Sequence, residues 1–300
     1  MELWVPITIF AAFCQNLRSA LQKHLRGRLS TSGATFSRFF YAVPFAALYA
    51  TLLAAIAGFP VPEPNAAFVA YALLGGLAQI IATALLLYLF GFRNFAVGTT
   101  YSKTETVQTA LFGVVILGDP IGVGASIAIL VSLVGVMAIS VATTDIRARS
   151  LLQSLTEKTA LIGIASGAFF GISAVSYRGA SLSLGGEGFL MQAAFTLACV
   201  TVFQTLVMAL YMRLREPGQI TRVVQAWRVA GLVGLSGMLG SAGWFTAMTI
   251  QNAAYVRALG QIELVFTFAA SYFFFREKTN RVELLGIALV IGGILLLLLS

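Results

Sequence analysis

Long apolar runs, separated by short polar segments, follow one another along the whole chain. Each run has about 20 residues, the length that an α-helix needs to cross the hydrocarbon core of a bilayer. The pattern predicts an all-α membrane protein with ten transmembrane helices. Their expected positions are residues 3–22, 33–57, 66–91, 95–117, 121–142, 159–182, 188–212, 229–251, 253–275 and 282–299.

The composition agrees with this pattern and excludes an ordinary soluble domain. Of the 300 residues, 59% are apolar and 10% are charged, whereas a soluble domain has about 25% charged residues. The mean hydropathy is +0.91. Ten spans with short connections use the whole length, so we expect neither a soluble domain nor a cofactor.

Basic residues concentrate on one side of the predicted topology, in or beside the odd-numbered loops. By the positive-inside rule these loops are cytoplasmic, so both termini are expected on the opposite, periplasmic side. The formal net charge of +8 is then directed at the anionic lipid of the bilayer and not at a nucleic acid. The residues concerned are Lys23, Arg26, Arg28, Arg93, Arg147, Arg149, Lys158, Arg213, Arg215, Arg222, Arg228, Arg276, Lys278 and Arg281.

The two halves of the chain are weakly similar to each other. We therefore predict two five-helix repeats, residues 1–150 and 151–300, and the odd number of helices inverts the second repeat relative to the first. Inverted repeats around a central cavity are typical of transporters. A shift of 158 positions places Asn94, Ala96, Glu105, Val107, Thr109, Asp119 and Gly135 on Asn252, Ala254, Glu263, Val265, Thr267, Glu277 and Gly293.

Charged residues inside the predicted fourth and ninth helices form the first candidate site. Lys103 and Glu105 lie in the fourth helix, Arg257 and Glu263 lie in the ninth, and both acids fall near the middle of the membrane. A charge at that depth costs about 2.5–3.5 kcal/mol on insertion scales, so it should face protein or water. Two interpretations stay open. The acids pair with Lys103, Arg257 or Arg18 and fix the packing, or one of them changes protonation or contacts a substrate.

Polar and aromatic side chains extend this candidate site. Tyr101, Glu105 and Gln108 recur at helical spacing, and Gln261 shares a helix face with Arg257. Polar faces turn away from lipid, so residues on other helices should line a cavity or bond between helices. The candidates there are Gln15, Tyr71, Gln79, Tyr88, Tyr177, Trp244 and Met248.

The eighth predicted helix has a glycine at every third position from Gly231 to Gly243. Because glycine weakens helices and permits close approach, Gly237 and Gly240 are candidate hinge residues for transport, with plain tight packing as the alternative.

In the second predicted helix, Arg38 is interpreted as an anchor that reaches the membrane boundary. Pro44 is expected to kink that helix.

The helix number, the chain length, the short connections before the fourth and ninth helices, and the acids Asp119 and Glu277 together resemble a known family. This family is the ten-helix drug/metabolite transporter superfamily, in its EamA-type bacterial exporter branch. The resemblance implies an inverted-repeat carrier in the bacterial inner membrane. Within the superfamily the chain is most similar to exporters of aromatic and neutral amino acids. We expect a monomer that binds a small-molecule substrate.

The side chains expected in the cavity suit a zwitterion with an apolar body. Lys103 or Arg257 could hold a carboxylate, and Glu105, Glu263 or an aromatic face could hold an ammonium group. Export of amphipathic drugs is the alternative within transport, and a passive channel is the alternative mechanism. An enzyme is not expected, because His24 is the one histidine and no metal or nucleophile motif occurs.

Overall fold

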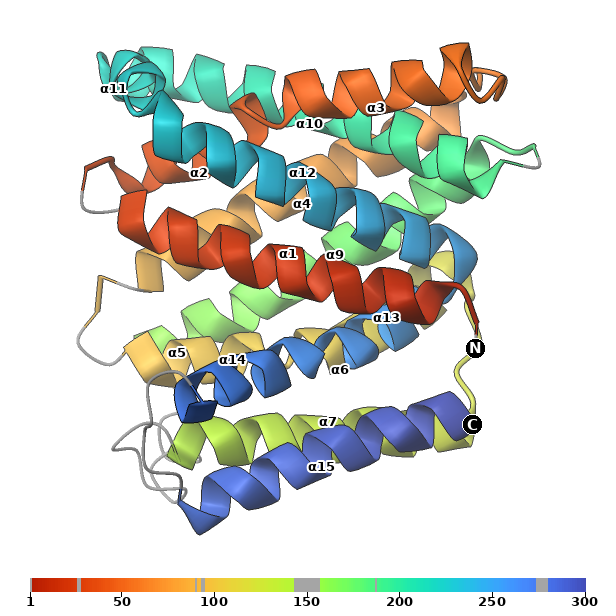
Figure 1. Cartoon of the computed structure of the whole chain (residues 1–300), viewed down its shortest axis with the longest axis vertical. Helices are drawn as coiled ribbons and strands as arrows, with labels where there is room; N and C mark the ends of the chain where they lie inside the picture. The colour runs from red at the N-terminus through yellow and green to blue at the C-terminus, as the bar shows by residue number, and fades with distance from the viewer. Residues whose placement is uncertain are drawn as a thin grey trace. The chain divides into compact units, whose positions relative to one another are not determined.

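The computed structural model describes residues 2–25, 28–89, 91–92, 95–142, 157–186, 188–273 and 280–300. These residues form helices and connecting segments, with no strand among them (Figure 1). Several residues used above lie outside these ranges, namely Asn94, Glu277, Arg26, Arg93, Arg147, Arg149, Arg276 and Lys278. The helices are α1 (Trp4–Leu25), α2 (Thr31–Phe40), α3 (Val43–Ala55), α4 (Ala66–Leu89), α5 (Phe95–Ser102), α6 (Glu105–Phe112), η1 (Gly113–Leu117), α7 (Val123–Ala142), α9 (Lys158–Ser183), α10 (Phe189–Arg215), α11 (Gln219–Gln225), α12 (Trp227–Ile250), α13 (Ala253–Gly260), α14 (Ile262–Phe273) and α15 (Arg281–Leu299).

Seven helical segments of the described residues are long and apolar enough to cross a membrane: Thr31–Ala55, Ala66–Leu89, Val123–Ala142, Lys158–Ser183, Phe189–Arg215, Trp227–Ile250 and Arg281–Leu299. The all-helical, multi-pass character expected from the apolar runs is therefore confirmed. The other three predicted spans contain α1, the series α5–α6–η1 and the pair α13–α14. The total of ten spans remains a prediction.

The chain forms two compact units, each assembled from two separate stretches. Unit 1 comprises Met1–Ile80 and Ser176–Gln251, and unit 2 comprises Ile81–Val175 and Asn252–Ser300. Each unit thus combines residues from both halves of the sequence. The proposed repeats, residues 1–150 and 151–300, describe sequence similarity and remain a prediction beside these spatial units.

In unit 1, α1 packs along α12, and α10 contacts α2, α3 and α12. Glycines make the first contact close, because a Cβ added to Gly243 would lie 2.8 Å from the Cβ of Ala11. The kink expected at Pro44 is confirmed as a break between α2 and α3, at Tyr41 and Ala42. Pro44 has no N–H for the Phe40 carbonyl, so the helical hydrogen bond is lost there. The break leaves Arg38 in the last turn of α2.

In unit 2, α7 and α15 run side by side and pack along each other (Figure 1). A Cβ added to Gly135 would lie 2.7 Å from the carbonyl oxygen of Gly286 and 2.8 Å from the amide nitrogen of Val290. A side chain on Gly163 of α9 would likewise meet the backbone of Gly98 in α5. Small residues at these positions let helix backbones touch, which is the usual basis of helix packing inside a membrane.

Candidate functional site

The fourth and ninth predicted helices are each broken near the middle. The first is interrupted at Lys103 and Thr104, between α5 and α6, and the second at Gln261, between α13 and α14. The break has the same local geometry in both: the Lys103 amide donates to the Thr100 carbonyl at 3.1 Å, and the Gln261 amide donates to the Ala258 carbonyl at 3.2 Å. The shift of 158 positions places the first of these bonds on the second.

The continuous helices expected over 95–117 and 253–275 are therefore corrected. No proline or glycine marks the first break, so the apolar periodicity runs through it. Side chains compete for the backbone instead: the Ser102 hydroxyl donates to the Thr99 carbonyl at 2.8 Å, and the Thr104 hydroxyl donates to the Tyr101 carbonyl at 2.6 Å. Such local bonds offer the backbone an alternative to the helix.

Two ion pairs join the broken helices across this region. Lys103 Nζ lies 2.5 Å from Glu263 Oε1, and a guanidinium nitrogen of Arg257 lies 2.9 Å from Glu105 Oε1. The pairs are crossed, because each broken helix contributes one cation and one acid. The side chains of Arg257 and Glu105 are 12% and 18% exposed. The pairing expected from the sequence is thus confirmed, and contact of these groups with a substrate remains a prediction.

The helix breaks themselves help to hold these charges. Glu105 lies in the first turn of α6 and Glu263 in the first turn of α14, where the positive end of the helix dipole stabilises an anion. Arg257 lies in the last turn of α13, at the negative end. Continuous helices would provide no such termini at this depth. A neutral bond, from Gln261 Nε2 to Thr106 Oγ1 at 2.9 Å, completes the connection.

The other predicted site residues of unit 2 are bonded or packed in place. Gln108 Nε2 donates to Thr104 Oγ1 at 3.0 Å. Tyr101 is 4% exposed and packs with Ala160, Met137, Val141 and Ile164. Its contact with a substrate is untested, and in this structure its ring belongs to the core.

In unit 1, two predicted residues meet through a third that the sequence did not single out. Tyr177 OH donates to Gln79 Oε1 at 3.1 Å, and Gln204 Nε2 donates to the same oxygen at 2.9 Å. Gln204 also lies 3.1 Å from Tyr177 OH and 3.2 Å from the Gly76 carbonyl. The signal that could have indicated Gln204 is an amide deep inside the long apolar run of residues 188–212, where Gln192 is the other amide.

The remaining candidates of unit 1 are more dispersed. Trp244 and Met248 are buried in α12, at 7% and 2% exposure. Tyr71 and Gln15 are half-buried. Tyr88, expected on an inward face, belongs to unit 2 and is 49% exposed. The helix that carries Gly237 and Gly240 is continuous from Trp227 to Ile250, so the hinge remains a prediction.

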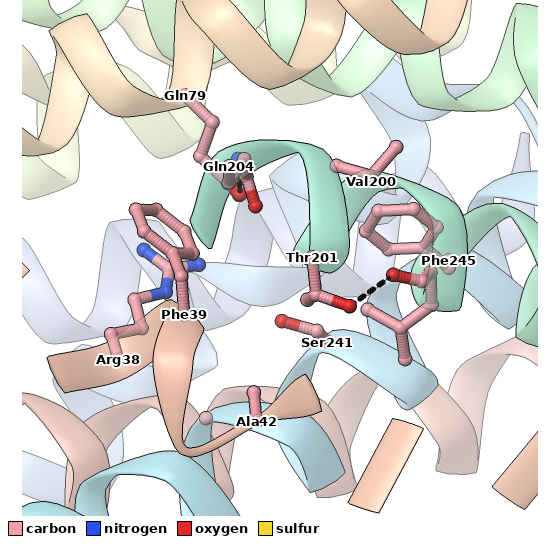
Figure 2. A pocket seen from close by; sticks show the side chains of 11 residues that line it. Arg38, Phe39, Ala42, Gln79, Val200, Thr201, Gln204, Ser241 and Phe245 are labelled. Carbon is pink, nitrogen blue, oxygen red and sulfur yellow. Dashed lines mark hydrogen bonds between the residues drawn. The ribbon is translucent and has the colours of Figure 1, made fainter. Parts of the chain in front are cut away.

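A small pocket lies beside Gln79 and Gln204 of unit 1, between α2, α4, α10 and α12 (Figure 2). Arg38 is one of its walls and is 6% exposed. The interpretation of Arg38 as an anchor at the membrane boundary is thus corrected, because its side chain is enclosed by protein. The kink at Pro44 ends α2 at Phe40, which places Arg38 in the last turn of that helix. A cation in the last turn of a helix is stabilised by the unpaired carbonyl groups there.

A larger hollow of unit 1 lies between α3 and α10 and has a volume of about 610 Å³. Apolar and small side chains line it, including Ala47, Val61, Phe195 and Leu206, with Thr51 and Cys199 as its few polar groups. Such a groove on membrane-spanning segments fits apolar chains. It offers no charged group for the recognition of a polar metabolite.

Comparisons with known proteins agree with this architecture. Residues 157–299, slightly less than half of the chain, match the EamA-like transporter family. A solved structure, described only as "Crystal structure of protein", aligns with a TM-score of 0.71 and 14% identity, over 99% of this chain and 96% of that chain. At this identity the likeness shows a shared fold. No curated protein matches the sequence. Residues 157–299 are thus similar to EamA-like transporters, and the long apolar helices are those of a multi-pass membrane protein.

Proposed function

We propose that this chain, whose residues 157–299 match the EamA-like transporter family, is a secondary transporter that exports small metabolites by alternating access. Amino acids, aromatic and neutral ones first, are the proposed substrates. The observation that carries the proposal is the pair of crossed ion bridges at two matching helix breaks. Discontinuous helices with charges at their breaks are the usual location of substrate and ion sites in transporters.

The packing of α7 on α15 supports two inverted repeats. Gly135 approaches the Gly286 carbonyl and the Val290 amide, and Gly293 approaches the Ala128 carbonyl and the Ser132 amide. Shifting by 158 positions converts Gly135 to Gly293, Ala128 to Gly286 and Ser132 to Val290. The same shift of 158 positions that aligns the helix breaks therefore turns the contact made by Gly135 into the contact made by Gly293. Reciprocal contacts of this kind are what two repeats related by a two-fold axis produce.

The ion pairs provide a mechanism for coupling a zwitterion to helix movement. Each bridge holds a broken helix of the first half against one of the second half. A carboxylate can replace Glu263 at Lys103, and an ammonium group can replace Arg257 at Glu105, with charge-assisted bonds of similar strength. The substrate would then compensate the charges while the two broken helices separate. A ligand with one charge would leave one buried group without compensation, which is costly.

The alternatives predict different transport behaviour. An exporter of amphipathic drugs needs the apolar lining and one acid, but neither Lys103 nor Arg257. A passive channel does not need the substrate to replace the ion-pair partners of Lys103 and Glu105. The proposed location is the bacterial inner membrane, as a monomer, with both termini periplasmic, because the basic residues such as Lys23, Arg213 and Arg281 gather at the odd loops.

Counterflow into liposomes tests the proposal. Purified protein reconstituted with internal phenylalanine should accumulate labelled phenylalanine, tryptophan, methionine or threonine with saturation at rising concentration. A passive channel would show no saturable counterflow. Absence of uptake of all four amino acids under every imposed gradient contradicts the substrate class.

Exchanging one ion pair separates packing from transport. In the double variant Lys103→Glu with Glu263→Lys, the bridge can re-form with its charges reversed, so the protein should fold and melt close to the wild type. We expect counterflow to fall at least about tenfold, the cost of one misplaced charge-assisted bond of about 1.4 kcal/mol or more. Wild-type counterflow in this variant would show that the pair only fixes the packing.

Glutamine substitutions of the acids address energy coupling. Glu105→Gln and Glu263→Gln remove a titrating carboxylate and keep its size. Proton-driven uptake should be lost in at least one of the two variants, while counterflow, which needs no gradient, persists at a reduced rate. Full gradient-driven transport in both variants would remove these acids as coupling sites.

A further inference from the structure

The apolar groove of unit 1 lies between two segments that are long and apolar enough to cross a membrane, Thr31–Ala55 and Phe189–Arg215. Large apolar side chains on its walls are exposed, among them Val61, Val202 and Leu206. Left empty, the groove would deprive these side chains of contact partners on one side. An apolar molecule from the membrane therefore has to fill it.

The two helices that form the groove run in opposite directions. Phe59, which follows α3, lies beside Gly188, directly before α10: a Cβ added to Gly188 would lie 3.6 Å from the Phe59 ring. Near the other end of α10, Met212 belongs to the same apolar cluster as Phe39 of α2. The lining residues come from α3, from Val61 and from α10. The groove thus begins at the start of α10 and runs toward its end.

The groove is narrow for its length. Its α10 wall extends from Met191 to Leu206, which is about 22 Å at the rise of an α-helix. A volume of about 610 Å³ over this length corresponds to a cross-section of about 30 Å². A helix about 10 Å wide needs about 80 Å², so a helix of a second copy of this chain does not fit inside. A single hydrocarbon chain does.

The two ends of the groove differ in charge. From Leu206 the same face of α10 continues through Leu210 to Arg213, four and seven residues further on, and both of these side chains are exposed. At the opposite end, Glu63 is exposed two residues after Val61. An anionic headgroup is therefore attracted at the end of α10, where a guanidinium can bind a phosphate with two parallel bonds, and is repelled at its start.

We propose that the groove holds one acyl chain of an anionic phospholipid whose headgroup phosphate is bound by Arg213. Half of a bilayer about 40 Å thick, headgroups included, spans about 13 residues of helix. A chain that begins at Arg213 thus passes Leu206 and Phe203 and ends near Cys199, and these three residues line the groove. The groove is no more apolar than the surrounding lipid, so the preference for this lipid comes from its charge. The inference does not depend on the proposed transport function.

Native mass spectrometry of the purified, delipidated protein measures this preference. From an equal mixture of phosphatidylglycerol and phosphatidylcholine, whose own ammonium group balances its phosphate, the first bound lipid should be phosphatidylglycerol by about fivefold, the factor that one basic residue contributes at an anionic surface. Arg213→Gln should remove this preference. Arg215→Gln, a matched change of an exposed arginine on the other side of α10, should retain it. Equal losses in both variants, or no preference in the wild type, would overturn the proposal.

A phosphatidylglycerol with a diazirine at the end of one acyl chain shows where the chain lies. In phosphatidylcholine nanodiscs that contain this lipid, irradiation should label α10 most strongly between Cys199 and Leu206. Arg213→Gln should lower this labelling at least about threefold and leave the labelling of the exposed Leu130 and Val134 of α7 unchanged. A parallel decrease on α7, or no label on α10, would contradict a chain held in the groove.

Filling the groove tests the chain separately from the headgroup. Ala47 is an exposed residue of the α3 wall, so Ala47→Phe occupies the space and leaves the core intact. This variant should lose the first bound phosphatidylglycerol, whereas Ala55→Phe, at the exposed last residue of α3, should keep it. Wild-type binding by Ala47→Phe would show that the headgroup binds without the groove. A dimer in the native mass spectrum that Ala47→Phe abolishes would assign the groove to a second copy and overturn the inference.

Discussion

Replacing Arg257 with glutamine should destabilise the protein by about 3 kcal/mol, because the variant leaves Glu105 as an uncompensated charge in a site with little access to water. Arg257 and Glu105 are 2.9 Å apart, and their side chains are 12% and 18% exposed. Breaking a buried pair by removing one partner costs about 3–5 kcal/mol, and the residual exposure places this pair at the lower end. Thermal unfolding of the purified variant in one fixed detergent measures the loss.

The double variant Arg257→Gln with Glu105→Gln is the decisive control. Removing both charges also removes the cost of burying them, so most of the lost stability should return, to within about 1 kcal/mol of the wild type. Arg222→Gln, at an exposed position of α11, provides a matched change without a buried partner and should be neutral. Single variants that melt like the wild type would show that water already compensates this pair.

Gly234→Ala should be the most damaging single methyl group in α12. Its Cβ would lie 2.5 Å from the carbonyl carbon of Tyr41, and backbone cannot move aside as a flexible side chain can. Overpacking of this kind costs about 1–3 kcal/mol and sometimes more, and contact with backbone places Gly234 at or above the upper limit. We expect a large drop in the yield of folded protein and in its melting temperature.

Gly231→Ala, one turn earlier on the same helix, is the matched control. Nothing lies within 4 Å of the Cβ it would add, and alanine is favoured over glycine inside a helix by about 1 kcal/mol. This variant should therefore be neutral or slightly more stable. If both variants behave alike, the close approach of α12 to Tyr41 does not occur in the folded protein.

The sequence indicated which residues matter in unit 2 more clearly than how they are arranged. Lys103, Glu105, Arg257 and Glu263 stand out because charges are rare in apolar runs. Their partners could not be assigned, because a residue two positions away on a helix points elsewhere, and the choice across helices depends on rotation and depth. The break at Lys103 was invisible to periodicity, since it arises from serine and threonine hydroxyls and not from proline.

The environment predicted for Arg38 was wrong. A lone arginine near the end of a predicted span is usually able to extend to the membrane boundary, so the sequence favoured an anchor. The structure encloses it because Pro44 ends α2 close by and because α4, α10 and α12 converge there. Convergence of distant segments cannot be read from local pattern, and for the same reason Gln204 was not selected. Pro44 itself was predictable, since its effect is local.

Each compact unit needs parts of the chain that are synthesised far apart in time. The glycine face of α7, including Gly135, is covered by α15, yet α7 leaves the ribosome long before residues 281–299 exist. Until then that face must rest against lipid or against the insertion machinery. A translation product that stops before Arg281 would leave this face of α7 without its partner helix. The order of synthesis thus makes the closure of unit 2 a late event in the maturation of this protein.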